Sequence, residues 1–461
     1  MERAAKARPF TQLNIVPDIL RRRIANRPNL LQIVDNIGWL FVDRILRMGV
    51  GLLVGVWIAR YLGPEQFGSL SFATAFVGLF GAIAGLGLQG IVVRDIVRDP
   101  ACKEVTLGTA AALQLIGGLL AYGLMLGTVL WLRPDDSLAR VLVAILGSMM
   151  LFRLSDTAAY WFESQVQSRY TVWVQNATFL VFALIKVMLI LLGAPLVAFA
   201  WAVTAEALVV SVLMLFVLSL RGPKLGQLVV SLQRAKGLLA DSWPLLLSGV
   251  AVVIYTKVDQ IMLGQLTGDE AVGIYSAAVR VSEVWYFVPV AIVASVFPSI
   301  LAAKKRNEAQ YNLRLQRLYD LMVWLAVAVA VPMTFLSGSV VRLLFGDSYA
   351  GAGPVLAIHI WAAVFVFLGV ASGQWFLVEN RQAMSLQRTV FGALVNVALN
   401  SVFIPRYGFL GAAWATVIAQ MAAAFLFDLI QRETRAMFLM KLRAMNPISV
   451  MTRNRRYLRA E

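Results

Sequence analysis

The chain has 461 residues, of which 60% are hydrophobic and 14% charged, and it carries 41 Lys and Arg against 25 Asp and Glu for a formal net charge of +16. A soluble domain usually has about 25% charged and about 45–50% apolar residues, so this composition excludes an ordinary soluble protein and indicates one embedded in a lipid bilayer. The basic residues are spread over many connections and both tails, which favours a membrane role over nucleic-acid binding.

The first 36 residues are polar and basic and do not read as a cleavable signal peptide. We expect them to form a cytoplasmic tail. Within this tail, residues 13–24 mix Leu, Ile and Val with three Arg, so the segment could lie along an anionic membrane surface or simply be solvated.

Twelve apolar runs follow, and each is close to the roughly 20 residues that a helix needs to cross a bilayer core. They predict an all-α integral membrane protein with twelve transmembrane helices. The runs are 37–60, 67–93, 105–132, 139–162, 171–192, 196–219, 242–264, 272–301, 319–345, 353–378, 387–405 and 408–431.

A polar connection at 221–241 is the longest internal one and lies near the middle of the chain. We interpret it as a cytoplasmic linker between a six-helix N-lobe at 37–220 and a six-helix C-lobe at 242–431, with a basic C-terminal tail at 432–461. If the twelve helices alternate in direction, most Lys and Arg outside them lie on the side of the two tails, which places both termini in the cytoplasm. Both lobes then start on the same side, as in a parallel repeat about an axis along the membrane normal.

A short pattern of Gly, Glu, Gly, Ser and Ala supports this repeat. It occurs at 63–73 and again at 268–278, an offset of 205 residues, between the first two apolar runs of each lobe. In the first copy we expect Gly63 and Pro64 to make a tight reversal, and Gly68 and Ala73 to allow close helix packing.

Charged residues lie inside several predicted helices of both lobes, although each costs about 2.5–3.5 kcal/mol at a helix centre. Their clustering predicts a water-filled cavity lined by these helices. The candidate residues for substrate binding and translocation are Arg44, Arg47, Arg153, Lys186, Lys257 and Arg280. The candidate residues for ion coupling are Asp43, Asp156, Glu206, Asp259 and Glu283.

An alternative is that these charges only neutralise one another on single helix faces, at spacings of three or four residues. Three pairs have such a spacing: Asp43 with Arg47, Arg153 with Asp156, and Arg280 with Glu283. Four residues have no such obvious partner, so theirs must come from other helices or from a ligand: Lys186, Glu206, Lys257 and Asp259.

Other chemistry finds little support in the sequence. Cys102 is the only cysteine, which excludes an intrachain disulfide and a cysteine metal site. His359 is the only histidine and lies in an apolar run, so we interpret it as a packed, hydrogen-bonded helix residue. The chain has no Walker A pattern, nucleophile elbow or His-Glu-x-x-His, so we expect no ATP hydrolysis, no metal, no cofactor and no enzymatic activity.

The sequence resembles a known family at several points. The stretch from Asn36 to Gly68, which contains Ala-Arg-Tyr-Leu-Gly-Pro-Glu-Gln-Phe-Gly, is similar to the opening of bacterial polysaccharide (O-antigen and exopolysaccharide) repeat-unit flippases. That family shares a superfamily with the multidrug and toxic compound extrusion transporters. Later segments are also similar: Asp259-Gln-Ile-Met-Leu-Gly, Gly273-Ile-Tyr-Ser-Ala-Ala and Tyr407-Gly-Phe-Leu-Gly-Ala-Ala-Trp-Ala.

The resemblance covers about residues 36–431 and implies two six-helix bundles arranged in a V around a central cavity. It implies transport of a polyprenyl-pyrophosphate-linked oligosaccharide from the cytoplasmic to the periplasmic leaflet of the bacterial inner membrane by alternating access, coupled to protons or sodium. It also suggests a polysaccharide polymerase and chain-length machinery as partners. Cationic cavity residues are common in such proteins, and Arg44, Arg153, Lys186, Lys257 and Arg280 are compatible with that role. Peptidoglycan-precursor flippases typically have fourteen helices, so twelve argues against that assignment.

Two other functions remain open at this point. A drug or organic-cation antiporter should have a net acidic cavity, and the six cations against five carboxylates named above disfavour it mildly. A membrane polysaccharide polymerase or ligase would need a catalytic periplasmic loop, and the predicted outer loops are too short to hold one.

Overall fold

The computed structural model describes residues 28–379 and 381–450, and it describes side chains from residue 46 onward apart from those of Leu225 and Leu377. All regular secondary structure within these residues is helical. The prediction of an all-α membrane fold is therefore confirmed for the described part of the chain.

Ten helical stretches of the described chain are long and apolar enough to cross a membrane. Two of them, Leu46–Arg98 with 53 residues and Gln382–Ile430 with 49, are far longer than one crossing of a roughly 30 Å bilayer core requires. Each contains a glycine with positive φ that interrupts the helix, Gly63 at 74° and Gly408 at 55°. Two crossings in each would give twelve, but that number stays a prediction.

The described chain divides into two compact units by its internal contacts. Unit 1 comprises the chain up to Gly55 together with Phe80–Gly249. Its helices are the two ends of α2 (Pro28–Ala84), α3 (Leu88–Arg98), α4 (Lys103–Leu132), α5 (Ser137–Gly147), the 3-10 helix η3 (Ser148–Ser155), α6 (Asp156–Ser164), α7 (Arg169–Leu191), α8 (Leu196–Arg221) and the first half of α9 (Leu232–Leu266).

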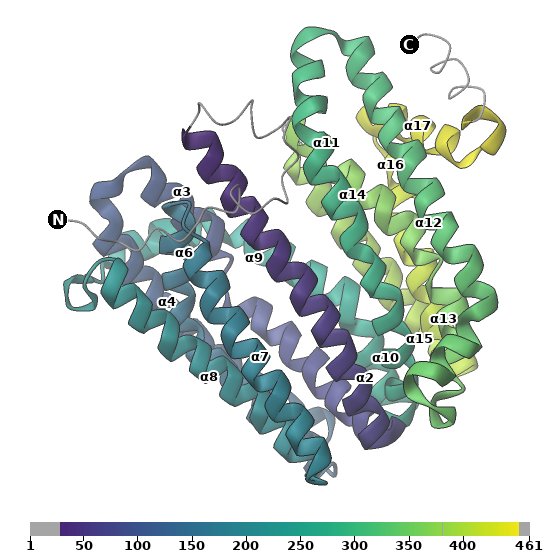
Figure 1. The fold of residues 1–461 in the computed structure, drawn as a ribbon, viewed down its shortest axis with the longest axis horizontal. Coiled ribbons are helices and arrows are strands. Elements are labelled where there is room, and N and C mark those ends of the chain that lie inside the picture. The colour runs from purple at the N-terminus through teal and green to yellow at the C-terminus, as the bar shows by residue number, and fades with distance from the viewer. Residues whose placement is uncertain (1–27, 380, 451–461) are drawn as a thin grey trace. The chain divides into compact units, whose positions relative to one another are not determined.

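Within unit 1 the long helices α7 and α8 pack against each other, and η3 packs against α4 and α8 (Figure 1). Large apolar side chains stay exposed along α4 and α7, including Leu120 at 70%, Leu184 at 71% and Leu191 at 77%. Such exposure is unfavourable in water and is expected where lipid tails surround the helices.

Unit 2 comprises Val56–Leu79 together with the chain from Val250 onward. Its helices are the middle of α2, the second half of α9, α10 (Asp269–Glu283), η5 (Val284–Tyr286), α11 (Phe287–Arg306), α12 (Glu308–Phe345), α13 (Ala352–His359), α14 (Ala362–Val378), α15 (Gln382–Met421), the π-helix η7 (Ala422–Leu426), α16 (Phe427–Ile430) and α17 (Arg435–Met445). A core cluster of this unit joins α11, α12, α14 and α17 around buried side chains such as Tyr319, Met322 and Phe367. Helices α11 and α12 meet at one end of this unit, where Lys305 and Arg306 are exposed (Figure 1).

The two copies of the repeated sequence pattern pack against each other inside unit 2. A Cβ added to Gly68 would lie 1.7 Å from the carbonyl oxygen of Asp269, and one added to Gly273 would lie 1.9 Å from that of Pro64. These four residues correspond across the 205-residue offset, so the contact is reciprocal, as at a local twofold axis. Ser69 adds a hydrogen bond of 2.6 Å from its hydroxyl to the Asp269 carboxylate.

The predicted roles of the glycines in this pattern are confirmed. Gly63 (φ 74°, ψ 171°) and Gly268 (φ 94°, ψ 174°) adopt nearly the same left-handed backbone conformation at the start of the two crossing helices. Because a side chain at Gly68 or Gly273 would collide with backbone, only glycine permits this approach.

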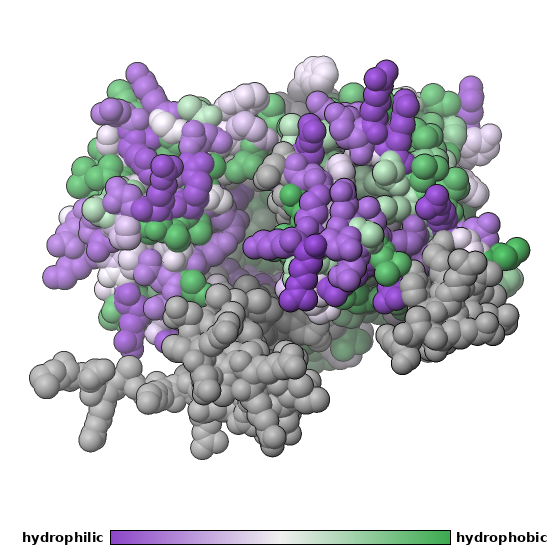
Figure 2. All heavy atoms as spheres, turned by 90° about the horizontal axis from the view of Figure 1, so that it is seen from above, coloured by the Kyte–Doolittle hydropathy of each residue, from purple (hydrophilic) through white to green (hydrophobic). Residues whose placement is uncertain are grey.

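Hydrophilic side chains are frequent on the face that is seen from above in Figure 2. Polar ends and apolar flanks are the distribution that a bilayer imposes on a multi-pass protein.

Candidate functional site

Two of the predicted membrane helices are interrupted at charged residues. The run 139–162 is divided into α5, η3 and α6, and Arg153 lies in η3. The run 272–301 is divided into α10, η5 and α11, and Glu283 is the last residue of α10. Interrupted membrane helices leave backbone groups free to bind ligands and are a frequent feature of transporter binding sites.

Arg153 is held at the interruption in unit 1 by groups from two helical segments. Its Nε donates to the carboxylate of Asp156 at 3.1 Å, and Nη1 donates to the carbonyl of Gly81 near the end of α2. A Cβ on Gly85 would lie only 3.0 Å from Nη2, so the absence of a side chain there makes room for the guanidinium. The same-helix pair of Arg153 and Asp156 thus exists, with both side chains about one-third exposed.

Lys186 and Glu206 form an ion pair between α7 and α8, with 2.7 Å between Nζ and Oε2 and exposures of 14% and 19%. The expectation that their partners come from other helices is confirmed. The pair lies at a contact between two membrane-spanning helices, where one charge without the other would be costly.

Arg47 contacts α7 as well. Its Nε donates to Asn176 at 3.2 Å, Nη2 donates to Gln175 at 3.4 Å, and its guanidinium lies 5.5 Å from the ring centre of Phe179. The proposed pairing of Arg47 with Asp43 falls outside the described side chains, as do the side chains of Asp43 and Arg44.

In unit 2 the pair of Arg280 with Glu283, which the alternative of neutralisation on one helix face requires, is not formed. Lys257 of α9 lies 3.8 Å from Glu283, and Arg280 lies over the ring of Phe67 at 5.2 Å from its centre. The choice of partner for Glu283 has a geometric reason. Helix α10 packs against different neighbours on its different faces, so a cross-helix partner replaces the one a turn away.

Asp259 is the most enclosed of the candidate carboxylates whose side chains the structure describes, with 4% exposure. Its Oδ1 accepts from the backbone N–H of Gln260 at 3.0 Å, and its Oδ2 accepts from the hydroxyls of Tyr275 and of Thr416, the latter at 3.1 Å. Tyr275 comes from α10 and Thr416 from α15, so three helices meet at this carboxylate.

Tyr275 and Thr416 were missed by sequence reasoning, because both lie in apolar runs and carry no charge. The ring of Tyr275 also meets His359 edge-on at 6.0 Å, and His359 Nδ1 is 3.0 Å from the hydroxyl of Ser282. The interpretation of His359 as a packed, hydrogen-bonded residue is confirmed. The family-like segment Gly273-Ile-Tyr-Ser-Ala-Ala contains Tyr275 and was the one signal that could have drawn attention to it.

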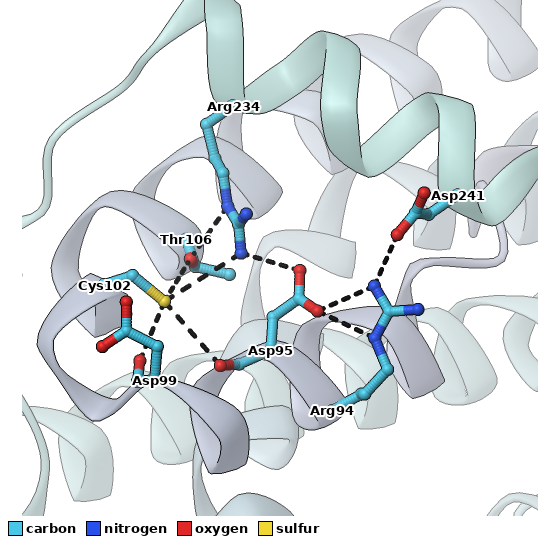
Figure 3. Close-up of polar contacts among 7 residues, drawn as sticks. All are labelled: Arg94, Asp95, Asp99, Cys102, Thr106, Arg234 and Asp241. Atoms are coloured by element: carbon cyan, nitrogen blue, oxygen red, sulfur yellow. Dashed lines mark hydrogen bonds and ion pairs between the residues drawn. The ribbon is translucent and has the colours of Figure 1, made fainter.

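A further polar network in unit 1, also missed, joins α9 to α3 and α4 (Figure 3). Arg234 of α9 donates to Asp95 at 2.7 Å and to Thr106 at 3.1 Å, and Arg94 contacts Asp241 of α9 at 2.5 Å. Adjacent residues of α3 therefore bind α9 at two points about two turns apart. The Cys102 thiol lies within this network and donates to the carbonyl of Asp99 at 2.9 Å.

Helix α17 is fastened to unit 2 by a fully buried ion pair. Lys441 donates to Asp428 at 2.6 Å and to the carbonyl of Ala424 at 2.7 Å, and both charged side chains have 0% exposure. Ala424 belongs to the π-helix η7, whose wider turn leaves carbonyls available. Burial lowers the pKa of Lys441 to about 8, although the charge of Asp428 opposes this shift.

The described residues contain no group of three His, Cys, Asp or Glu suited to a metal ion. The charged and polar side chains just described can instead bind anionic groups through Arg and Lys, or exchange a small cation or proton at the carboxylates. Helices that span the bilayer, interrupted at charged residues, define the class of the protein as a multi-pass membrane transporter.

Comparison with known proteins identifies the family. The profile of the polysaccharide biosynthesis protein family matches residues 33–304, and that of the MatE family matches residues 244–402. Because the first match spans more than half of the chain, the chain belongs to the polysaccharide biosynthesis protein family.

Individual proteins agree with this assignment. A probable low-salt glycan biosynthesis flippase of Haloferax volcanii is 24% identical, over 82% of this chain and 79% of its own length. The inward-facing structure of a multidrug resistance MATE family transporter has a TM-score of 0.71 at 17% identity, covering 89% of this chain and all of that one. The lipid II flippase MurJ in an inward closed conformation has a TM-score of 0.69 at 14% identity, covering 89% of this chain and 91% of that one.

The structural likenesses show a shared two-lobe transporter fold and confirm the predicted fold class. The relatives are flippases and transporters, so the protein is a transporter of polysaccharide biosynthesis and not an enzyme.

Proposed function

We propose that the protein flips polyprenyl-pyrophosphate-linked oligosaccharide repeat units from the cytoplasmic to the periplasmic leaflet of a bacterial inner membrane by alternating access. The observation that carries the proposal is the set of cations held within membrane-spanning helices by neighbouring helices, in a chain of the polysaccharide biosynthesis protein family. A pyrophosphate is the part of such a substrate that most needs compensating charge in a medium of low dielectric constant.

The cations are suited to a transient anion because their present partners are exchangeable. Arg153 keeps about a third of its side chain exposed while it bonds Asp156 and Gly81, and Lys257 is 36% exposed beside Glu283. A guanidinium binds two phosphate oxygens with its fork of N–H donors, so Arg47, Arg153 and Arg280 suit pyrophosphate. Lys186 and Lys257 add positive charge, and Arg44 remains a candidate by position.

Coupling to an ion gradient is part of the proposal. Asp156, Glu206 and Glu283 are each in an ion pair, whereas Asp259 is bonded to uncharged groups. A carboxylate that gains or loses a proton or cation can change its bonds to three helices at once, so Asp259 is the foremost coupling residue, with Asp43 a further candidate by position.

Orientation and partners follow from the same function. The excess of Lys and Arg on the side of the two tails supports cytoplasmic termini, and the cytoplasmic leaflet is where the repeat units of such a flippase are built. A polymerase and chain-length machinery would then receive the flipped units.

A bacterial strain that lacks its own repeat-unit flippase provides the test. The wild-type chain is expected to restore surface polysaccharide, whereas Lys257→Ala and Arg280→Gln are expected to reduce it without loss of protein from the membrane. If both variants restored the polysaccharide fully, the role of these cations would be refuted.

A drug or organic-cation antiporter is the second candidate, because the fold is shared with a multidrug resistance transporter. Export of cationic dyes from cells that carry the chain would favour it. The six cations against five carboxylates named in the helices disfavour this candidate mildly, because a cation carrier should have a net acidic cavity.

A further inference from the structure

Asp259 differs from Asp156, Glu206 and Glu283, because each of these three carboxylates has a cationic partner and Asp259 has no such partner among the described side chains. Among the described residues no Lys or Arg lies within ion-pair distance of it, since Lys257, two residues away on α9, contacts Glu283. Its bonds come from the Gln260 amide and the Tyr275 and Thr416 hydroxyls, all in a site that is 4% exposed. A carboxylate charge that is buried with only neutral partners requires compensation by a proton or a cation.

The hydroxyl groups around Asp259 form a closed triangle. The Tyr275 hydroxyl is 3.0 Å from Thr416 Oγ1, and either can donate to the other. Thr416 Oγ1 is also 3.0 Å from the carbonyl oxygen of Ala412, one turn earlier on α15. Each hydroxyl hydrogen therefore has two acceptors to choose from.

This triangle can hold or release one proton without moving a heavy atom. When Asp259 is ionised, the Tyr275 and Thr416 hydroxyls both donate to Oδ2. When Oδ2 carries a proton, it donates to the Tyr275 oxygen, the Tyr275 hydroxyl donates to Thr416, and Thr416 donates to the carbonyl of Ala412. Every donor has an acceptor in both states, because hydroxyl groups can both donate and accept.

The same arrangement is unsuited to a metal cation. A hard cation is held by several oxygen atoms that surround a common centre, each with a lone pair toward the ion. Here Asp259, Tyr275 and Thr416 contact one another at hydrogen-bond distances, so an ion could enter only by driving these oxygens apart.

The other groups that face this triangle also lack the oxygens for a cation shell. Lys257 on α9 is positively charged and would repel a sodium ion, and the carboxylate of Glu283 of α10 is paired with that lysine. His359 of α13 meets the edge of the Tyr275 ring with its Nδ1 turned to Ser282. Tyr286, in η5 after α10, is the remaining titratable neighbour.

We propose that Asp259, Tyr275 and Thr416 form a proton site that excludes sodium, so that the coupling ion of this transporter is the proton. The Tyr275 hydroxyl is the excluding group, because it is in direct contact with Oδ2 and a cation would have to displace it. The inference rests on the proposed coupled transport, and it specifies the ion.

The test is an infrared pH titration of the purified, lipid-reconstituted protein, which needs no transported substrate. The stretch of a protonated carboxyl group is expected to appear as the pH falls and to be absent from Asp259→Asn, which keeps the size of the side chain. Thr416→Val removes one hydrogen-bond donor to Asp259 and is therefore expected to shift the same band, which gives independent support for assigning the band to Asp259. The midpoint is expected to be identical in sodium and in choline chloride.

Tyr275→Phe keeps the ring contact with His359 and removes only the hydroxyl. In this variant sodium is expected to shift the titration of Asp259, whereas Tyr122→Phe, which loses a hydroxyl bonded to a backbone carbonyl in unit 1, is expected to behave as wild type. The proposal fails if sodium shifts the wild-type midpoint, if no carboxyl band depends on Asp259, or if Tyr275→Phe remains indifferent to sodium. Failure to flip lipid-linked oligosaccharides would refute the proposed function and leave these titrations unchanged, so the two failures are distinguishable.

Discussion

At the scale of single residues, ionisable groups in the membrane-spanning helices are bonded to groups on other helices. Lys186 with Glu206 and Lys257 with Glu283 are cross-helix pairs, and Arg47 is held by two amides of α7. These partners lower the free-energy cost of placing a charged side chain in the membrane. The pairs alone do not decide whether a charged residue also binds the substrate.

A double substitution separates these two roles for Lys186. Replacing both members of a buried ion pair with apolar residues is often neutral for stability. The free energy of unfolding of the double variant Lys186→Met with Glu206→Leu is therefore expected to lie within about 1 kcal/mol of the wild-type value. Flipping is expected to fall at least about tenfold, the effect of losing roughly 1.4 kcal/mol of interaction with the pyrophosphate. Thermal unfolding and vesicle flipping measured on one preparation check both parts, and undiminished flipping would make the pair purely structural.

Lys441 predicts a pH dependence of stability. Its pKa is about 8 in the folded protein and 10.5 in the ordinary, unfolded reference, so between these values the unfolded state binds more protons and stability rises with pH. The gain is about 3 kcal/mol over the whole window. Thermal unfolding from pH 8 upward is expected to show this rise in wild type and in Lys305→Met, an exposed lysine of the same unit, and to lose it in Lys441→Met. An equal slope in Lys441→Met would contradict the assignment.

The sequence identified most charged residues of the apolar runs because charge there is conspicuous, but it did not single out Asp428 in the run 408–431, which pairs with Lys441. The sequence did not show which residues form ion pairs, because the partner of a residue on a helix depends on which other helix packs against that face. Glu283 illustrates this, with Arg280 a turn away and Lys257 as its actual partner. The role of Tyr275 and Thr416 as partners of Asp259 was not predicted, because a residue with an uncharged hydroxyl in an apolar helix usually has only a packing role.

At the scale of helices, the crossing of α2 and α10 depends on two glycines that leave no space for a side chain. A methyl group on Gly68 would overlap the Asp269 carbonyl, so Gly68→Ala is expected to destabilise unit 2 by about 1–3 kcal/mol or more. Gly78→Ala is the matched control, because a Cβ there meets nothing within 4 Å. The control is expected to be neutral or slightly stabilising in thermal unfolding, and similar losses in the two variants would disprove the tight crossing.

The network between α3 and α9 predicts unequal costs for its two arginines. Arg94 and Asp241 are each 50% exposed, so Arg94→Met is expected to cost less than about 1 kcal/mol. Arg234 bonds Asp95, which is 13% exposed, and Thr106 as well, so Arg234→Met is expected to cost about 1.5–3 kcal/mol. Denaturant or thermal unfolding of the two variants measures the difference, and a larger cost for Arg94→Met would reverse this view of the network.

Helix positions were largely predictable, whereas helix interruptions were not. The apolar runs locate the spans, and Gly63 and Gly408 mark the breaks in the two longest stretches. The break before η3 follows Gly147, and η5 ends three residues before Pro289. Glycine and proline also occur elsewhere in the apolar runs, so these residues did not locate the breaks by themselves. The contacts that Arg153 and Glu283 make across helices at these places carry no local sequence signal.

At the scale of the whole molecule, the repeat of the sequence relates two segments that are 205 residues apart in the chain and that pack against each other within unit 2. The reciprocal contact of Gly68 and Gly273 explains why the same pattern recurs after 205 residues, since its two copies pack against each other, which the sequence alone does not show. The limits of the two lobes and the count of twelve crossings remain predictions, because the helices α2 and α9 each contribute to both units. Cysteine accessibility at the predicted turns would settle the count.

The most direct measurement of the central claim uses sealed inverted vesicles and a labelled polyprenyl-pyrophosphate-linked repeat unit added to their outer leaflet. A membrane-impermeant reagent then reports how much label stays accessible. With the protein present, the label is expected to become protected with time, faster under an imposed pH gradient and unaffected by a sodium gradient, whereas Arg153→Gln slows protection. Protection no faster than in protein-free vesicles, under either gradient, would contradict the proposed flippase function.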